Sequence, residues 1–211
     1  MLRPVFSNIK FLESSDLPAI RTVRELPPYA NKVKARKYIE EKSKCSPTMH
    51  TYVCTIAFLD WGLERNFILD LTNHKAHIIG TDDELFSAFT LPSIGEAVAA
   101  VLQKPEETKN RTVRVQDIKI SLNKLLALAK KATSGTQRDV SYDNLDDLIA
   151  KADELLAKGL FDMKNFGQYL MKGTYGPGIS GAHESTDNER LSLKEKTEDD
   201  VFKLIQTLLR F

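Results

Sequence analysis

The sequence has few glycines, and none of them lies before Gly62. Only 10 of its 211 residues are glycine. A dinucleotide-binding fold places a glycine-rich turn between a strand and a helix, because a β-carbon there would keep the pyrophosphate from the backbone. No G-x-G-x-x-G or G-x-x-G-x-x-G motif precedes Lys32. The usual phosphate cradle is therefore absent from this stretch.

Cysteine, excess charge and long apolar runs are also scarce. Cys45 and Cys54 are the two cysteines and fit no zinc-binding spacing, which favours a reduced interior, with a disulfide as the alternative. The 30 basic and 29 acidic residues leave a net charge of +1, so we expect no bulk attraction to nucleic acid or membranes. No segment has the length of a membrane span or the form of a signal peptide, and a cytoplasmic protein is expected.

A metal site is not expected. His74 and His77 are three residues apart, and on a strand this offset directs the two side chains to opposite faces of the sheet. His50 and His183 are isolated in the sequence, and nothing around them indicates a function.

Strands and helices alternate first, and helices dominate later, which predicts an α/β fold. Asp60 to Gly62 reads as a turn after a buried strand, and Ser93 with Glu96 has the spacing of a capping box. Residues 173–190 are glycine-rich and predict a loop, either a mobile lid or a plain surface loop. The expected strands cover 9–12, 51–58, 76–79, 85–90, 112–116 and 139–142, and the expected helices 29–42, 63–71, 93–104, 122–129, 145–158 and 198–208.

The helix that follows Pro27 and Pro28 carries the most informative residue, Lys32. Proline suits the first helical turn, and Arg36 lies one turn after Lys32 on the same face. One interpretation is a solvated basic face. The other is a lysine whose basic neighbours favour the neutral amine, which can transfer protons near neutral pH.

Several segments of the sequence match a known family in their order and spacing. They are residues 27–40, 51–53, 58–63, 86–98, 104–111 and 115–117, with weaker matches at 126–131 and 187–189. Together these segments resemble the isoflavone reductase-like, NmrA-like family of atypical short-chain dehydrogenases, especially its fungal members. The resemblance covers nearly everything from about Phe11 to the end.

This resemblance implies one domain over residues 1–211, the C-terminal part of a reductase without its glycine-rich cofactor half. The fold would be a partial Rossmann-like sheet with a mostly helical substrate-side region, after an irregular segment over 1–28. The cofactor would be NADP(H), and Lys32 would be the general acid/base that steadies the substrate oxygen during hydride transfer.

Four further residues are candidates for binding a small aromatic or planar substrate. Phe58 ends the strand predicted over 51–58, and Asp60 and Trp61 follow it, at the sheet edge where α/β proteins bind ligands. Tyr29 lies three residues before Lys32 and either packs in the core or lines the same pocket. Ordinary burial is the alternative for Trp61, the single tryptophan.

Two other interpretations stay open beside a reductase. NmrA-like relatives bind dinucleotides or proteins without catalysis, so a regulator is one alternative, and an inactive fragment is the other. A parallel sheet without its first strands exposes an edge, and a second copy or a partner chain is expected to cover it.

Overall fold

The computed structural model describes residues 9–11, 26–46, 49–79, 84–160, 163–176 and 181–210. Its strands form three short sheets, with orders β1-β2-β6, β3-β5-β7 and β4-β8. All neighbouring strands are parallel except β5 and β7, which are antiparallel. The strands are β1 (Ile9–Phe11), β2 (Thr51–Cys54), β3 (Ala57–Phe58), β4 (Lys75–Ile79), β5 (Phe86–Phe89), β6 (Arg111–Arg114), β7 (Ile118–Ile120) and β8 (Asp139–Asp143).

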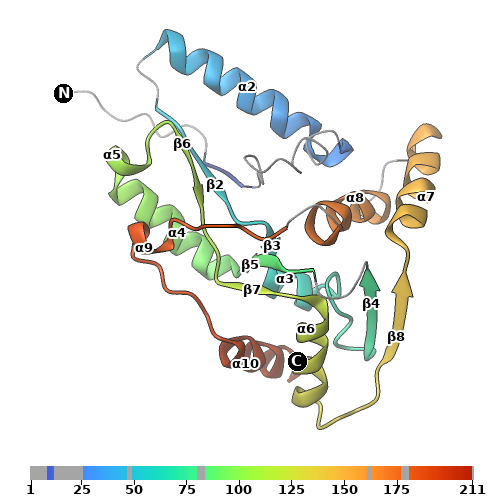
Figure 1. The fold of residues 1–211 in the computed structure, drawn as a ribbon. Coiled ribbons are helices and arrows are strands. Elements are labelled where there is room, and N and C mark those ends of the chain that lie inside the picture. Colours follow the sequence, from blue (N-terminus) through green and yellow to red (C-terminus); the bar gives the residue numbers. More distant parts are fainter. Residues whose placement is uncertain are drawn as a thin grey trace.

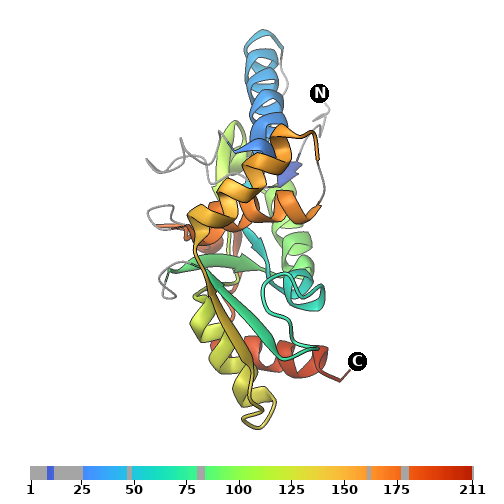
Figure 2. The ribbon, with the colours of Figure 1, turned by 90° about the vertical axis from the view of Figure 1, so that its right-hand side faces the viewer.

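Helices surround these sheets on several sides (Figures 1 and 2). A 3₁₀ turn precedes the long helix α2, whose start carries Lys32. The elements are η1 (Pro27–Tyr29), α2 (Ala30–Cys45), α3 (Leu59–Glu64), α4 (Leu91–Gln103), α5 (Pro105–Thr108), α6 (Leu122–Ala132), α7 (Leu145–Ala157), α8 (Met163–Tyr175), α9 (Asn188–Leu191) and α10 (Glu198–Leu208).

Strands β2 and β6 carry different helices on their two faces. Val53 and Val113 are fully buried in one cluster with Ile94 and other residues of α4. The alternate residue Tyr52 points the other way, and its hydroxyl donates to the Arg36 carbonyl oxygen of α2. Because strand side chains alternate between faces, this register fixes α2 and α4 on opposite sides of the sheet.

The single strand expected over 51–58 is wrong, because the chain breaks into β2 and β3. Ile56 has a φ of 58°, a value that a β-branched residue rarely adopts. The ladder between β2 and β6 continues to the end of β2, where the Cys54 carbonyl oxygen accepts the Val115 N–H at 3.1 Å. It also moves Phe58 into a second sheet, beside Phe89.

The larger core lies around β5, β7 and helices α3, α6 and α10. Its fully buried members include Leu59, Phe86, Leu125 and Ile205. Sheet β4-β8 borders this core, and helices α7 and α8 pack beside Ile79 in a smaller cluster. Ser121, Asn144 and Thr197 cap α6, α7 and α10, since each side chain accepts a backbone N–H at a helix start.

The segment over residues 181–196, which we call the C-terminal strap, crosses the sheets. The Ser87 N–H donates to the Gly181 carbonyl oxygen at 2.8 Å. Asp187 and Arg114 exchange two bonds, since the Asp187 N–H donates to the Arg114 carbonyl at 2.7 Å and the Arg114 N–H to the Asp187 carboxylate at 2.9 Å. The strap therefore acts as a covering layer tied to β5 and β6.

Four local expectations differ from the structure. The turn at Asp60 to Gly62 is instead the first part of α3. The short helix expected over 63–71 is wrong, because α3 already ends at Glu64. Helix α4 begins at Leu91, so Ser93 lies inside it and makes no capping box with Glu96. The loop predicted over 173–190 is shorter, because α8 reaches Tyr175 and α9 begins at Asn188. Of the irregular segment over 1–28, most lies outside the described residues.

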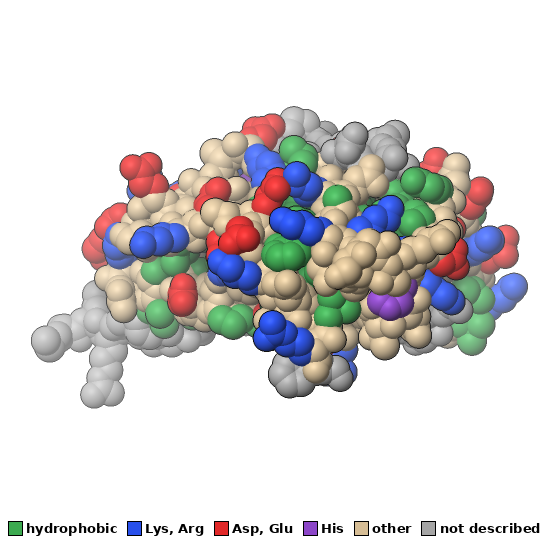
Figure 3. Space-filling view, turned by 90° about the horizontal axis from the view of Figure 1, so that it is seen from below, with side chains coloured by type: hydrophobic (Ala, Val, Ile, Leu, Met, Phe, Trp, Pro, Cys, Tyr) green, Lys and Arg blue, Asp and Glu red, His purple; other side chains and the backbone are tan. Residues whose placement is uncertain are grey.

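The charges are mixed over the surface. Figure 3 shows basic and acidic side chains interspersed on one face. Ion pairs such as Lys203–Asp199 (2.6 Å) and Lys124–Glu198 (3.0 Å) join the two signs. Among the described residues, no helix is both long and apolar enough to cross a bilayer.

Candidate functional site

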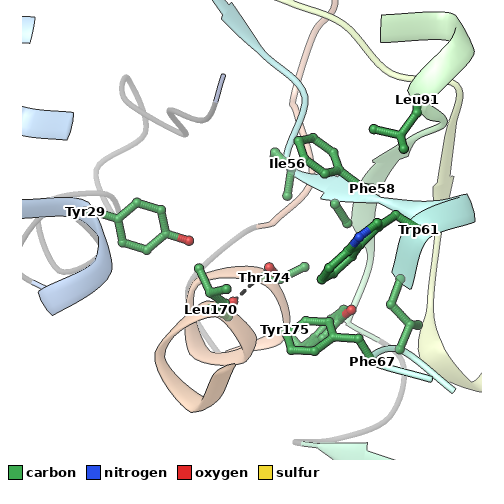
Figure 4. Close-up of a pocket in the computed structure, with 11 residues that line it drawn as sticks. Tyr29, Ile56, Phe58, Trp61, Phe67, Leu91, Leu170, Thr174 and Tyr175 are labelled. Carbon is green, nitrogen blue, oxygen red and sulfur yellow. Dashed lines mark hydrogen bonds between the residues drawn. The ribbon is translucent and has the colours of Figure 1, made fainter. Parts of the chain in front are cut away.

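A cavity of about 380 Å³ lies between the β3–α3 junction and the η1–α8 pair. Figure 4 shows its side chains, which come from η1, β3, α3, the start of α4, and α8. Apolar and aromatic groups make up most of the wall, as is usual for small-molecule sites. The lining residues are Tyr29, Ile56, Ala57, Phe58, Trp61, Phe67, Ile68, Leu91, Leu170, Thr174 and Tyr175.

Phe58 and Trp61 both line this cavity, and the junction between β3 and α3 positions both side chains. Phe58 ends β3, and Trp61 lies in the first turn of α3, which follows directly. The Trp61 ring lies 5.9 Å from the Phe67 ring and remains 36% exposed at the mouth. Gly62 makes this packing possible, since a β-carbon there would come within 2.5 Å of Ile68.

Asp60 does not line the cavity, but it forms hydrogen bonds with two residues that do. Its carboxylate accepts the Trp61 N–H at 2.8 Å and the Leu91 N–H at 3.0 and 3.1 Å. The Leu91 bonds satisfy a free donor at the start of α4, as a capping side chain does. Asp60 thus fixes two lining residues, Trp61 and Leu91.

Tyr29 lines the cavity, whereas Lys32 lies beside it. The Lys32 ammonium is 5.8 Å from the centroid of the Tyr29 ring, within the range of a cation–π contact. Burial raises the pKa of Tyr29 to about 12. The Tyr29 hydroxyl points toward the α8 side, where Leu170 and Thr174 lie (Figure 4).

The positive charge around Lys32 is smaller than the sequence suggests. Arg36, one turn away, pairs with Glu40 at 2.7 Å, and its guanidinium lies 4.5 Å from the centroid of the Tyr52 ring. The Glu40 carboxylate offsets the charge of Arg36, so Arg36 contributes less repulsion at Lys32 than an unpaired cation would. The role of Lys32 in proton transfer stays a prediction.

The sequence pattern did not indicate the wall that α8 provides. Leu170, Thr174 and Tyr175 come from this helix, and Tyr175 packs edge-on against Phe86 with ring centroids 4.8 Å apart. Burial raises the pKa of Tyr175 well above its ordinary value. The spacing of Leu170 and Thr174, four residues apart on one helix face, was the available signal.

The described residues do not form a dinucleotide phosphate cradle. Thr90, Ser121 and Asn144 connect strands to α4, α6 and α7, and each carries a β-carbon. Strand β3 runs into α3 without an intervening residue. Because close approach of a pyrophosphate needs glycine at such a junction, no reaction step through the cofactor is derived from these residues.

The chain is similar in sequence and in fold to known oxidoreductases. The chain is 29% identical to Oxidoreductase poxI from Penicillium oxalicum over 150 residues, which are 68% of this chain and 47% of that protein. It superposes on a crystal structure of isoflavone reductase with a TM-score of 0.66 at 19% identity, covering 92% of this chain and 60% of the other. No family model matches the sequence.

The fold is that of part of an isoflavone reductase-like protein. AtPrR2, solved with NADP+ and (+)pinoresinol, has the same TM-score of 0.66 at 18% identity, over 90% of this chain and 61% of AtPrR2. The resemblance and the α/β, Rossmann-like fold class are thus confirmed. The chain spans about half the length of the Penicillium relative, 47%.

Proposed function

We propose that this chain is the substrate-side part of an NAD(P)H-dependent reductase and that its apolar cavity holds a small aromatic or planar substrate. The observation that carries the proposal is the convergence of Tyr29, Phe58 and Trp61 on one cavity. Aromatic rings present flat apolar faces, which suit a planar ligand. The fungal relative is called an oxidoreductase, and AtPrR2 is bound to NADP+ and (+)pinoresinol, which supports this class of function.

Lys32 is the proposed general acid/base. It lies on the first turn of α2, and its ammonium contacts the face of Tyr29, which lines the cavity. From this place a short movement of the lysine side chain brings an N–H toward a ligand oxygen at the α2 side. Asp60 contributes as a positioning residue, because its carboxylate holds Trp61 and Leu91 in the opposite wall.

The cofactor is proposed to be NAD(P)H, held by residues other than the strand–helix junctions described above. The nicotinamide supplies hydride when bound, and the residues of this chain bind and orient the substrate. The binding partner of these residues is thus a small molecule.

The experiment is a calorimetric titration of the 211-residue chain with 1-indanone, a planar aryl ketone, followed by NADPH oxidation at 340 nm in its presence. We expect 1-indanone to bind. Lys32→Ala is expected to lower turnover by about 100-fold or more, the usual contribution of an acid/base group. Lys34→Ala is the control, because residues two apart lie on different helix faces.

Two results would contradict the proposal. A chain that does not bind 1-indanone or related planar ketones lacks the proposed substrate site. A chain that binds them, but oxidises no NADPH, fits the alternative of a non-catalytic binding protein. Equal turnover in the Lys32→Ala and Lys34→Ala variants would remove Lys32 from the reaction.

A further inference from the structure

Four of the side chains that line the cavity carry a polar group, and two of these groups are already hydrogen-bonded or exposed to water. The Thr174 hydroxyl donates to the Leu170 carbonyl oxygen at 2.9 Å within α8. The Trp61 side chain is 36% exposed at the mouth, where water can reach it. The remaining polar groups of the lining side chains are the hydroxyls of Tyr29 and Tyr175.

These two hydroxyls have no hydrogen-bond partner among the residues that the structure describes. Tyr29 is 8% exposed and Tyr175 is 4% exposed, so little of either side chain meets bulk water. Buried hydroxyls are usually paired, because leaving one unpaired costs free energy. A water molecule bound in the cavity would need roughly two to four polar partners, and few of the lining side chains are polar.

Both hydroxyls are donors at neutral pH. Burial raises the pKa of Tyr29 to about 12 and also raises that of Tyr175, so neither phenol loses its proton under ordinary conditions. The Lys32 side-chain nitrogen lies over the Tyr29 ring, 5.8 Å from its centroid. The missing partner of each phenol is therefore a hydrogen-bond acceptor.

We infer that Tyr29 and Tyr175 are ligand-binding residues that select, among planar apolar molecules, those that carry acceptor oxygens such as carbonyl or ether oxygens. The inference rests on the proposed function, which makes this cavity the substrate site. The two tyrosines come from separate elements, η1 and the end of α8, so they hold a ligand at two points. An apolar wall alone would favour size and flatness but would not distinguish a ketone from the matching hydrocarbon.

The test compares two probes that differ by one carbonyl group, 1-indanone and indane. Calorimetry measures the dissociation constant of each for wild type, Tyr175→Phe and Tyr29→Phe, substitutions that remove one oxygen and keep the ring. Wild type is expected to bind 1-indanone about fivefold to tenfold tighter than indane, the effect of one net hydrogen bond. At least one Phe variant is expected to lose this preference while binding indane as wild type does.

Tyr142→Phe is the matched control, because Tyr142 lies on β8 and is 66% exposed. It should leave both dissociation constants unchanged. The ligand-free Tyr175→Phe protein should melt at the wild-type temperature or higher, since it loses a buried hydroxyl without a partner. A lower melting temperature would contradict the absence of a partner.

The outcomes separate this inference from the proposed function. If both probes bind and the preference for 1-indanone survives in both Phe variants, the inference is overturned and the cavity remains a ligand site. If neither probe binds wild type, the proposed function fails and the inference fails with it. Loss of the preference in Tyr175→Phe or Tyr29→Phe, with indane binding intact, supports both.

Discussion

The Asp60 carboxylate accepts the Leu91 N–H through both oxygens, at 3.1 and 3.0 Å, and so joins α3 to the start of α4. The same carboxylate accepts the N–H of Trp61. Two residues of the cavity wall thereby depend on one side chain that lies outside the lining. The geometry of the wall is set by a helix cap, in addition to the packing of its rings.

Replacing Asp60 by alanine should destabilise the protein and displace Trp61. Loss of a helix cap costs about 1 kcal/mol, which lowers the melting temperature by roughly 2–4 °C in a chain of this size. Trp61 is the single tryptophan, so its fluorescence emission reports the wall directly. We expect the emission maximum to shift in Asp60→Ala.

The control is Ser121→Ala, which removes the cap of α6 away from the cavity lining. It should cost similar stability without moving the Trp61 emission. An unchanged emission in Asp60→Ala would show that the ring packing alone holds the wall.

His183 should make the stability of the protein depend on pH. Burial lowers its pKa from 6.5 to about 4, with the nearby charges of Arg114 and Lys119 acting in the same direction and the hydrogen bond to the Cys54 carbonyl opposing them. The unfolded chain binds this proton below pH 6.5, and the folded chain does so only near pH 4. The free energy of unfolding therefore falls as the pH drops through this window, by about 3 kcal/mol from this residue.

Chemical denaturation between pH 7 and 4 checks this sign. His183→Gln should flatten the pH dependence relative to wild type. His77→Gln, at a histidine whose side chain is 63% exposed, is the matched control substitution. An equal slope in His183→Gln and wild type would assign the acid sensitivity to other groups.

Two glycine substitutions should have opposite effects. A β-carbon at Gly181 would lie 2.0 Å from the Thr174 carbonyl oxygen, so Gly181→Ala must push the C-terminal strap away from α8. Overpacking of this kind costs about 1–3 kcal/mol. A β-carbon at Gly95, inside α4, meets nothing within 4 Å, and Gly95→Ala should stabilise the chain by about 0.5–1 kcal/mol.

Thermal melting of both variants decides the point. We expect a lower melting temperature for Gly181→Ala and a higher one for Gly95→Ala. A Gly181→Ala protein as stable as wild type would mean that the strap does not approach α8 as closely as described.

Self-association through an open sheet edge stays a prediction. Within the described residues, β1 pairs with β2 alone and β8 with β4 alone. Such edges present unpaired backbone groups to another chain. Light scattering on the purified chain should give a mass above 23.8 kDa, and a monomer at every concentration would contradict this expectation.

Local signals predicted much of the fold, because the elements concerned carry their own start and stop residues. Helix α7 begins after the Asn144 cap, and Gly159 follows its end with a φ of 74°. Helix α8 was not predicted, because its glycines and polar residues obscure the helical spacing of its apolar residues. Packing against α7 stabilises this helix in the folded chain. The break at Ile56 was also hidden, because it separates two strands that pair with different distant partners, β2 with β6 and β3 with β5.

Only part of the cavity wall could be predicted from the sequence. Tyr29, Phe58 and Trp61 do line one cavity, although each could have been ordinary core. Tyr175 could not be predicted as a lining residue, because its position depends on α8, a helix that the sequence pattern did not indicate. Asp60 was placed in the right neighbourhood, but only three-dimensional contacts reveal that it caps α4.

The most direct test of the central claim is an NMR measurement of where 1-indanone lies on the ¹⁵N-labelled chain. With Trp61 as the single tryptophan, its indole N–H signal can be assigned without ambiguity. The account predicts that this signal moves on titration and that the ligand shows nuclear Overhauser contacts to the Trp61 ring and the Leu91 methyl groups. A bound ligand whose contacts fall elsewhere, with the indole signal unmoved, would contradict it.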